Sequence, residues 1–176
     1  MANSEALQEL QSRLASRLQA ARSEGVSANW LAVKAGGRNY LLPLSQSGEI
    51  YPLAHLQSVP YTRPWFMGVI NIRGGLFGVV DLADFLAHNG GASRLAPLGA
   101  TGSVVSLNPA LEVNCALRVD ALAGLRGTDA FKTTTPAQAD GPEFLGGQFV
   151  DAQGESWQEI NVRVLSQAAS FLGIGV

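Results

Sequence analysis

The interpretation of the whole chain starts from one stretch, Gly68-Val-Ile-Asn-Ile-Arg-Gly-Gly-Leu-Phe-Gly-Val-Val-Asp-Leu82. Apolar, mostly β-branched runs on both sides of a glycine pair predict two strands joined by a tight hairpin, because glycine adopts the positive φ that two-residue turns require. We place this turn at Gly74-Gly75, which pairs Ile72 with Phe77. One face of the hairpin then carries only apolar side chains, namely Ile70, Ile72, Phe77 and Val79. The opposite face carries Asn71, Arg73, Leu76 and Gly78.

Further short strands are predicted on both sides of this hairpin. The expected strands lie at 30–34, 39–44, 49–51, 103–107, 111–119, 144–151 and 157–162, and short helices are expected at 81–87 and 165–172. Within 111–119, apolar and polar residues alternate, which predicts a strand buried on one face only, with Arg118 on the other face. The region 127–141 is polar and has no strand pattern. About eight to ten short strands with little helix between them are typical of barrels and sandwiches.

An amphipathic helix is predicted before the first strand, within residues 1–26. Its apolar positions recur at intervals of three and four residues, at Leu7, Leu10, Leu14, Leu18 and Ala21. Ser4 can cap the start of this helix, and Gly25 can end it in the left-handed conformation. Such a stripe fits a helix that packs on the protein's own body, and it equally fits a helix that docks on a partner.

Composition and charge argue against several classes of function. The 176 residues are 47% hydrophobic, which predicts a folded core rather than a disordered chain. The formal net charge is -2 and no basic tract stands out, so we expect no nucleic-acid partner, whose phosphates require cationic contacts. The apolar runs are too short for a membrane span, and the charges of the first residues do not fit a signal peptide. We therefore expect a cytoplasmic protein without membrane insertion.

No pattern of catalytic or metal-binding residues stands out in the sequence. The two histidines, His55 and His88, and the single cysteine, Cys115, do not have the spacing of metal ligands, and Cys115 fits a buried structural thiol. We predict no enzymatic activity, no metal and no cofactor. The alternative, an enzyme on a small β-barrel, requires a pocket with paired carboxylates, for which Asp81 and Asp120 are the candidates.

Two charged residues occur in apolar surroundings. Arg73 ends an apolar strand, and Glu49 precedes Ile50-Tyr51-Pro52-Leu53. A charge in such a position must reach solvent, pair with an opposite charge or serve an interface. Our hypothesis is that Arg73 and Glu49 form a partly buried ion pair, whose loss would cost about 3 kcal/mol or more. Asn71 shares a face with Arg73 and is the next candidate for the same surface.

The stretch 68–82 resembles the core motif of CheW-like domains, which runs roughly Gly-Val-Ile-Asn-Leu-Arg-Gly and, after a few residues, Val-Ile-Asp-Leu. Flanking segments at 37–44, 49–50 and 116–125 also resemble the family, so the resemblance spans roughly Trp30 to Leu172. Departures occur at Gly78, where family members often have proline, and at Ala121, where they have glutamate. The long segment before Trp30 is similar to that of the type IV pilus variant of the family.

The resemblance implies a mainly β fold, with two five-stranded β-barrels around a shared core and short helices at both ends. It places the CheW-like domain, made of two intertwined lobes, at 27–176. It also implies a non-catalytic adaptor that couples the cytoplasmic tip of a methyl-accepting chemoreceptor to the regulatory domain of a CheA-like histidine kinase, in control of type IV pilus twitching motility. Arg73, Glu49 and Asn71 would then fix the receptor groove, whereas Gly68, Gly74 and Gly75 would be backbone requirements.

Two further interpretations stay open. A CheW-like domain could dock a different signalling partner, which the sequence does not distinguish. A small barrel could also bind nucleic acid, although such sites interleave basic and aromatic residues, and acidic residues outnumber basic ones here.

Overall fold

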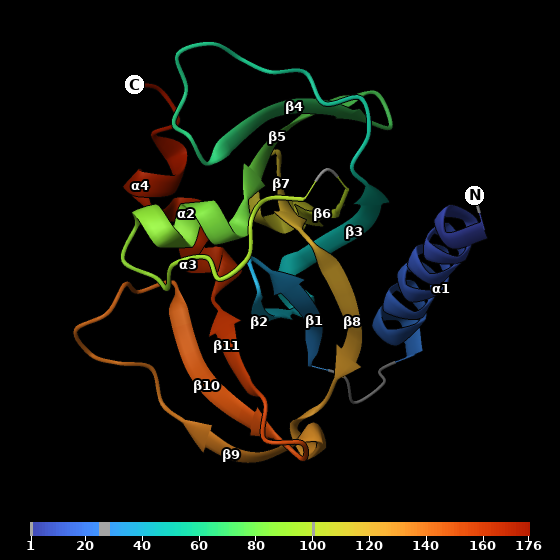
Figure 1. Cartoon of the computed structure of the whole chain (residues 1–176), viewed down its shortest axis with the longest axis vertical. Helices are drawn as coiled ribbons and strands as arrows, with labels where there is room; N and C mark the ends of the chain where they lie inside the picture. Colours follow the sequence, from blue (N-terminus) through green and yellow to red (C-terminus); the bar gives the residue numbers. More distant parts are fainter. Residues whose placement is uncertain (1, 25–28, 100) are drawn as a thin grey trace.

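The computed structural model describes residues 2–24, 29–99 and 101–176, and its described strands form two sheets (Figure 1). Sheet A has six described strands in the order β8-β1-β2-β11-β10-β9. Their bounds are β1 Trp30–Ala35, β2 Arg38–Pro43, β8 Ala121–Arg126, β9 Phe131–Thr135, β10 Leu145–Asp151 and β11 Ser156–Ile160. Sheet B has five described strands in the order β3-β6-β7-β5-β4. Their bounds are β3 Ser47–Pro52, β4 Phe66–Ile72, β5 Gly75–Asp81, β6 Ser103–Leu107 and β7 Cys115–Val119.

The described helices do not alternate with the strands: α1 precedes all of them, α2 lies between β5 and β6, and α3 and α4 follow the last strand. The described α-helices are α1 Ala2–Glu24, α2 Leu82–His88, α3 Val162–Gln167 and α4 Ala169–Leu172, and short 3₁₀ turns lie at Leu44–Gln46, Pro109–Leu111 and Thr128–Ala130. Asp81 caps α2, because its side chain accepts a hydrogen bond from the Asp84 amide at 2.8 Å. Aspartate is favoured at this position, since the first amides of a helix have no acceptor within the helix. After α4, the C-terminal tail returns to the loop before β4, where the Arg63 amide donates to the Ile174 carbonyl at 2.7 Å.

Sheet B is an insertion within the sequence of sheet A. All of its strands lie between residues 47 and 119, whereas sheet A combines 30–43 with 121–160. The late strand β11 pairs in parallel with the early strand β2, with Gln158 opposite Tyr40. One large apolar cluster joins the two sheets, because it contains Leu42 and Ile160 of sheet A together with Val80 and Leu117 of sheet B. The two sheets therefore share one core and form a single folded unit.

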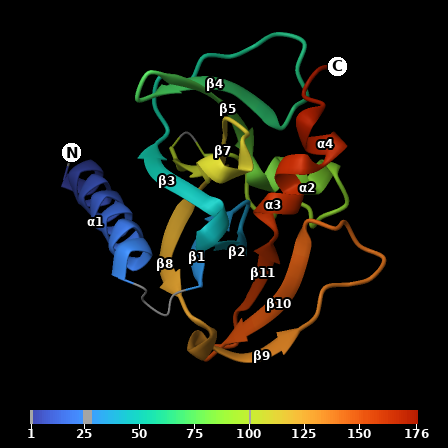
Figure 2. The same ribbon diagram turned by 180° about the vertical axis from the view of Figure 1, so that it is seen from behind.

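The expected pair of five-stranded barrels is corrected by this arrangement. The mainly β fold and the terminal helices are confirmed, but sheet A has a sixth described strand, and the described strand order of neither sheet closes into a ring. The two edge strands of sheet A, β8 and β9, lie in segments without clear alternation of apolar and polar residues. The sequence therefore did not indicate them, and sheet A has one strand more than expected. Figure 2 shows the strands of sheet A curving, as expected from strand twist. In the described strand order, its outer strands β8 and β9 are not hydrogen-bonded neighbours.

The register of the β4–β5 hairpin differs from the prediction by a shift of the turn. Ile72 lies opposite Gly75 and Ile70 opposite Phe77, so the two turn residues are Arg73 and Gly74. Because the partner of each residue moves by two positions, the alternation of faces is unchanged. Ile70, Ile72 and Val79 are buried together, with Phe77 packed against them, as the pattern predicted.

The N-terminal helix begins at Ala2, so Ser4 lies inside its first turn and does not cap it. Alanine has the highest helix propensity, which favours this extension. The predicted end at Gly25 lies outside the described residues. Leu14 and Leu18 are buried, whereas Leu7 and Leu10 are exposed, so only part of the predicted stripe packs on the body of the protein.

Candidate functional site

The tip of the β4–β5 hairpin presents Arg73 on a backbone conformation that arginine seldom adopts. Arg73 has φ +49° and Gly74 has φ +82°, which are the two positive φ values of a type I′ turn. The Asn71 side chain braces this turn, because its Oδ1 accepts a hydrogen bond from the Gly74 amide at 3.0 Å. Asn71 therefore supports the turn that presents Arg73.

Arg73 and Glu49 lie together at the surface. The Arg73 Nη1 is 3.0 Å from the Glu49 Oε1, and the two side chains are 74% and 36% exposed. The expected partial burial is therefore wrong for Arg73, because its turn projects beyond the sheet instead of ending within a strand. An exposed pair of this kind contributes about 0–1 kcal/mol, well below the figure for a buried pair.

A hollow of about 290 Å³ lies beside this ion pair. Tyr51 of β3 donates its hydroxyl to Glu49 Oε2, which places a phenol next to the pair. Burial and the adjacent Glu49 carboxylate raise the pKa of Tyr51 to about 12, so the phenol stays protonated at neutral pH. Apolar groups from Ile72, Phe77 and Val113 line the same hollow. The site combines a charged rim with an apolar floor, which suits recognition of a protein surface.

The three motif glycines have three different structural roles. Gly68 has φ +137°, and a Cβ placed on it would lie 2.2 Å from the Gln57 carbonyl oxygen. Gly74 has a positive φ but open space around it, as a turn residue at a hairpin tip should. Gly75 has no such φ, and an added Cβ would meet the Phe77 ring at 3.1 Å. Only Gly68 and Gly74 thus require glycine for backbone conformation.

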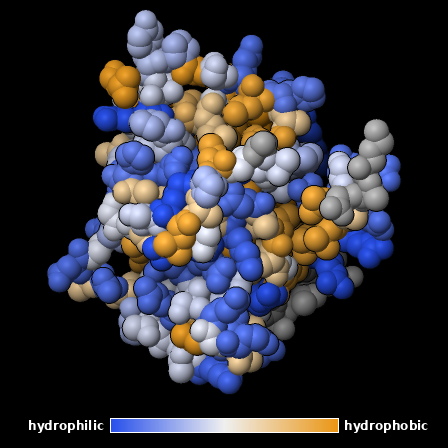
Figure 3. Space-filling model, in the orientation of Figure 1, coloured by the Kyte–Doolittle hydropathy of each residue, from blue (hydrophilic) through white to orange (hydrophobic). Residues whose placement is uncertain are grey.

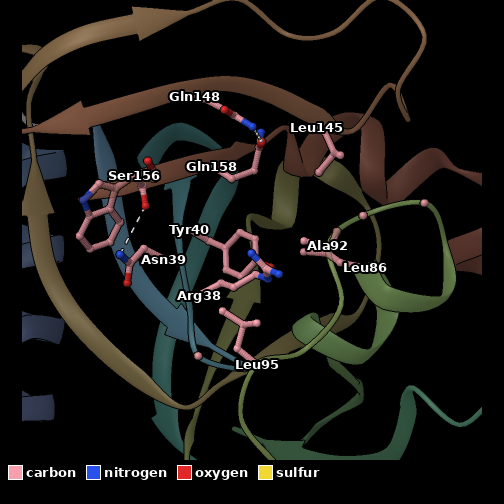
Figure 4. Close-up of a pocket in the computed structure, with 14 residues that line it drawn as sticks. Arg38, Asn39, Tyr40, Leu86, Ala92, Leu95, Leu145, Gln148, Ser156 and Gln158 are labelled. Carbon is pink, nitrogen blue, oxygen red and sulfur yellow. Dashed lines mark hydrogen bonds between the residues drawn. The ribbon is translucent and has the colours of Figure 1, made fainter. Parts of the chain in front are cut away.

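A second hollow, of about 360 Å³, lies where β2, the segment after α2 and the β10–β11 hairpin meet (Figure 4). Figure 4 shows Arg38 and Tyr40 on one side of it, facing Leu86 and Ala92. Gln148 and Gln158 lie along another side and are joined by a hydrogen bond at 3.3 Å. The guanidinium of Arg38 donates to the Ser93 carbonyl at 2.7 Å, which ties β2 to the segment after α2.

The most deeply buried charges form a network that the sequence did not reveal. Arg118 and Asp81 each have 1% of the side chain exposed, and Arg118 Nη1 lies 3.1 Å from Asp81 Oδ2. Asp120 is also paired with Arg118 Nη1, at 2.5 Å. Arg94 pairs with the other Asp81 oxygen at 2.6 Å. Asp120 accepts a hydrogen bond from the Gly36 amide at 2.6 Å, so the network reaches the β1–β2 turn of sheet A.

The prediction that the strand at 111–119 is buried on one face only is wrong. All residues of β7 are buried, because β7 lies inside sheet B, antiparallel to β6 and parallel to β5. The Arg118 side chain is accommodated by two carboxylates and by the carbonyls of Gly99 and Thr101. Arg118, although it is a basic residue in an alternating strand, therefore belongs to a buried ion-pair network and is not exposed to solvent.

The carboxylates proposed for an enzymatic site do come together, but as partners of one arginine. Asp81 and Asp120 both bind Arg118, and Asp81 is almost completely removed from solvent. Neither lines the two hollows described above. This geometry supports ion pairing within the fold rather than acid–base chemistry on a substrate.

Cys115 offers a direct check of the burial of β7. Its side chain is buried, and burial raises the pKa of the thiol to about 12. Because the thiolate is the reactive form, we expect no reaction with 5,5′-dithiobis(2-nitrobenzoate) at pH 8 in the native state. One equivalent should react after unfolding in guanidinium chloride. Rapid labelling of the native protein would contradict the packing of this strand.

The described residues hold no cluster of metal-ligand side chains and no helix able to span a membrane. None of their histidine, cysteine, aspartate and glutamate side chains gather in groups of three or more suited to a metal ion. Within the same part of the chain, every helix lacks the combination of length and apolarity required to cross a membrane.

Comparisons with known proteins agree on the relationship. A family model described as the CheW-like domain matches residues 29–170. Protein PilI of Pseudomonas aeruginosa is 29% identical over 167 residues, which cover 93% of this chain and 89% of PilI. The crystal structure of the scaffolding protein TtCheW from Thermoanaerobacter tengcongensis superposes with a TM-score of 0.58 at 17% identity, covering 77% of this chain and 89% of that one. At this identity the structural likeness concerns the fold. With the family model spanning both sheets, the chain belongs to the CheW-like domain family.

Proposed function

We propose that this protein is a non-catalytic, cytoplasmic adaptor that couples a methyl-accepting chemoreceptor to a CheA-type histidine kinase. Membership of the CheW-like family supports an adaptor in a chemotaxis-like signalling system. The similarity to PilI along nearly the whole chain supports a system that controls type IV pilus twitching motility. The regulatory domain of the kinase and the cytoplasmic tip of the receptor are the two partners.

The observation that carries this proposal is the conformation of Arg73. A left-handed conformation costs a residue other than glycine about 1–2 kcal/mol, and Arg73 adopts it at an exposed hairpin tip where its side chain pairs with Glu49. Backbone strain held at an exposed, charged position is a feature of binding surfaces. We assign Arg73, with Glu49 as its ion-pair partner and Asn71 as its brace, to the receptor-facing surface.

Replacing Arg73 with glycine should separate binding from stability. Glycine relieves the left-handed strain, so we expect an unfolding free energy that is unchanged or higher by up to about 1 kcal/mol. Affinity for the receptor's cytoplasmic fragment should fall by about tenfold or more, because charge-assisted hydrogen bonds contribute about 1.5–3 kcal/mol. Affinity for the kinase regulatory domain should stay within about twofold. Isothermal titration calorimetry with the two fragments from the same organism measures both affinities.

His55 provides the matched control, because it is also exposed and also has a positive φ, of +53°. The change His55→Gly relieves similar strain without touching the ion pair, and both affinities should stay at the level of the unchanged protein. Unaltered receptor binding by Arg73→Gly would remove Arg73 from the proposed surface. If the unchanged protein binds neither fragment while a CheW control binds both, the domain serves a different signalling partner.

A further inference from the structure

The hollow between β2, the segment after α2 and the β10–β11 hairpin contains a cation without a counter-charge. Among the described residues that line this hollow, Arg38 alone is charged. Arg94 and Arg118 both pair with Asp81, whereas Arg38 forms no ion pair within the described residues. The Nε of Arg38 donates to the Ser93 carbonyl, and its two Nη groups have no acceptor in the same part of the chain. The hollow therefore offers two charged donors to an anion.

A second kind of donor lies beside Arg38 on the same strand. Tyr40 is only 2% exposed, and Figure 4 shows its ring pointing into the hollow next to the Arg38 side chain. Its hydroxyl has no hydrogen-bond partner among the residues that the structure describes. Burial raises the pKa of Tyr40 above its ordinary value, against a smaller opposing effect of Arg38 and Arg94, so the phenol keeps its proton at neutral pH. A buried hydroxyl without a partner costs free energy, and an oxygen of a ligand would supply the acceptor.

The remaining walls of the hollow suit an organic group. Ala92, Leu95 and Leu145 line it, and the Leu95 side chain is left 68% exposed. A smaller hollow of about 130 Å³ shares Gly90 and Leu145 with it, so the space continues toward the loop at 135–142. The volume of about 360 Å³ lies at the lower end of the range for small-molecule sites, which combine apolar walls with a few polar groups.

The surroundings of this hollow favour a small molecule over a protein surface as its occupant. Figure 3 shows apolar residues interspersed with hydrophilic ones in the region of α2 and β10, which face the viewer in Figure 1. The centre of a protein interface is more apolar and is depleted in charge. The hollow is also walled on several sides, by β2, by the segment after α2 and by the β10–β11 hairpin (Figure 4).

We propose that this hollow binds a small organic carboxylate with an apolar body. The carboxylate accepts hydrogen bonds from the Nη groups of Arg38 and from the Tyr40 hydroxyl, and the body packs against Leu95 and Leu145. One guanidinium matches the single charge of a carboxylate. A phosphate monoester carries a charge of about −1.5 to −2 at neutral pH, which one guanidinium does not compensate. The site is separate from the receptor surface at Arg73 and does not depend on the proposed adaptor function.

Titration of the isotope-labelled full chain with sodium phenylbutyrate, followed by amide chemical shifts, tests the site. We expect shift changes concentrated at 38–40, 86–95 and 145–158, with a dissociation constant on the order of 1 mM or tighter, as suits a ligand of about 12 heavy atoms. Phenylbutanol has the same body without the charge, and acetate has the charge without the body. Each should bind at least about tenfold more weakly than phenylbutyrate.

Three substitutions assign the contacts. Tyr40→Phe removes only the hydroxyl, so phenylbutyrate affinity should fall by about fivefold or more. Stability toward urea should be unchanged or higher, since that hydroxyl has no partner in the fold. Arg38→Gln keeps a donor for the Ser93 carbonyl but removes the charge, and affinity should fall by about tenfold or more. Arg163→Gln removes the same charge from an exposed residue outside the hollow and should leave affinity unchanged.

The contrary outcomes each remove a stated part of the proposal. Absence of phenylbutyrate binding by the unchanged protein, or shift changes away from the hollow, would overturn the site. Affinity that survives both Arg38→Gln and Tyr40→Phe would overturn the assigned contacts. Equal affinity for phenylbutanol would overturn recognition of a carboxylate, and tighter binding of phenyl phosphate would overturn the choice of anion. Release of phenylbutyrate by the receptor or kinase fragment would assign the hollow to a partner protein and overturn the small-molecule ligand.

Discussion

Replacing Arg118 with methionine is expected to lower the free energy of unfolding by about 3–5 kcal/mol, because it removes one member of a buried ion network. The change leaves the Asp120 carboxylate without its cation and Asp81 with Arg94 alone. It also removes the donor to the Thr101 carbonyl, bonded at 2.6 Å, and so frees the segment before β6. Urea unfolding followed by tryptophan fluorescence measures the loss.

An exposed ion pair supplies the comparison for Arg118. Arg13 pairs with Glu9 one helical turn away at 2.7 Å, and both side chains are mostly in solvent. The change Arg13→Met should alter the unfolding free energy by no more than about 0.5 kcal/mol. Equal effects of the two substitutions would show that the Arg118 network does not hold the sheets together.

Replacing Gly68 with alanine should cost about 3 kcal/mol or more, for two independent reasons. The φ of +137° is strained for any side chain, and the new methyl group would collide with the backbone of Gln57. That backbone has little freedom to move, because Gln57 and Val69 exchange hydrogen bonds of 2.9 and 2.8 Å. Thermal and urea unfolding should both report the loss.

The other two motif glycines separate the causes. Gly74→Ala introduces strain at φ +82° without a collision and should cost about 1 kcal/mol. Gly75→Ala meets only the Phe77 ring, which can rotate, and should stay within about 1 kcal/mol of the unchanged protein. If the Gly68→Ala protein is as stable as the Gly74→Ala protein, the backbone at Gln57 must move to make room for the new methyl group.

The strands with regular alternation could be predicted from the sequence, and those without it could not. The apolar face of β4 and β5 follows from local residue preferences. Strand β9 is short and its threonines are exposed, so no apolar face marks it. Its pairing with β10 is decided by the chain brought alongside, which is a property of the whole fold rather than of the segment.

The candidate site was predictable in its members but not in its burial. The apolar surroundings of Glu49 and Arg73 indicated a pair, and the side chains lie 3.0 Å apart. Their exposure depended on the position of the turn, which includes Arg73. Arg73 adopts a left-handed conformation that sequence rules assign to glycine, so the turn was not predicted at this residue. The Arg118 network could not be predicted, because Asp81 and Arg94 come from segments far from Arg118 in the chain, although Asp120 is only two residues away.

The insertion of sheet B into sheet A has a consequence for the protein while the ribosome is making it. Strand β2 has been synthesised long before β11, its neighbour in the sheet, because 117 residues separate the ends of the two strands. At about 5–20 residues per second, this gap corresponds to roughly 6–23 s of translation. Until β8 is made, β1 and β2 form a hairpin without another strand of sheet A beside it, a structure of marginal stability in water, and the other edge of β2 stays unpaired until β11 follows. That hairpin is the part of the nascent chain for which we expect the greatest need of a chaperone, until the last strand of sheet A emerges.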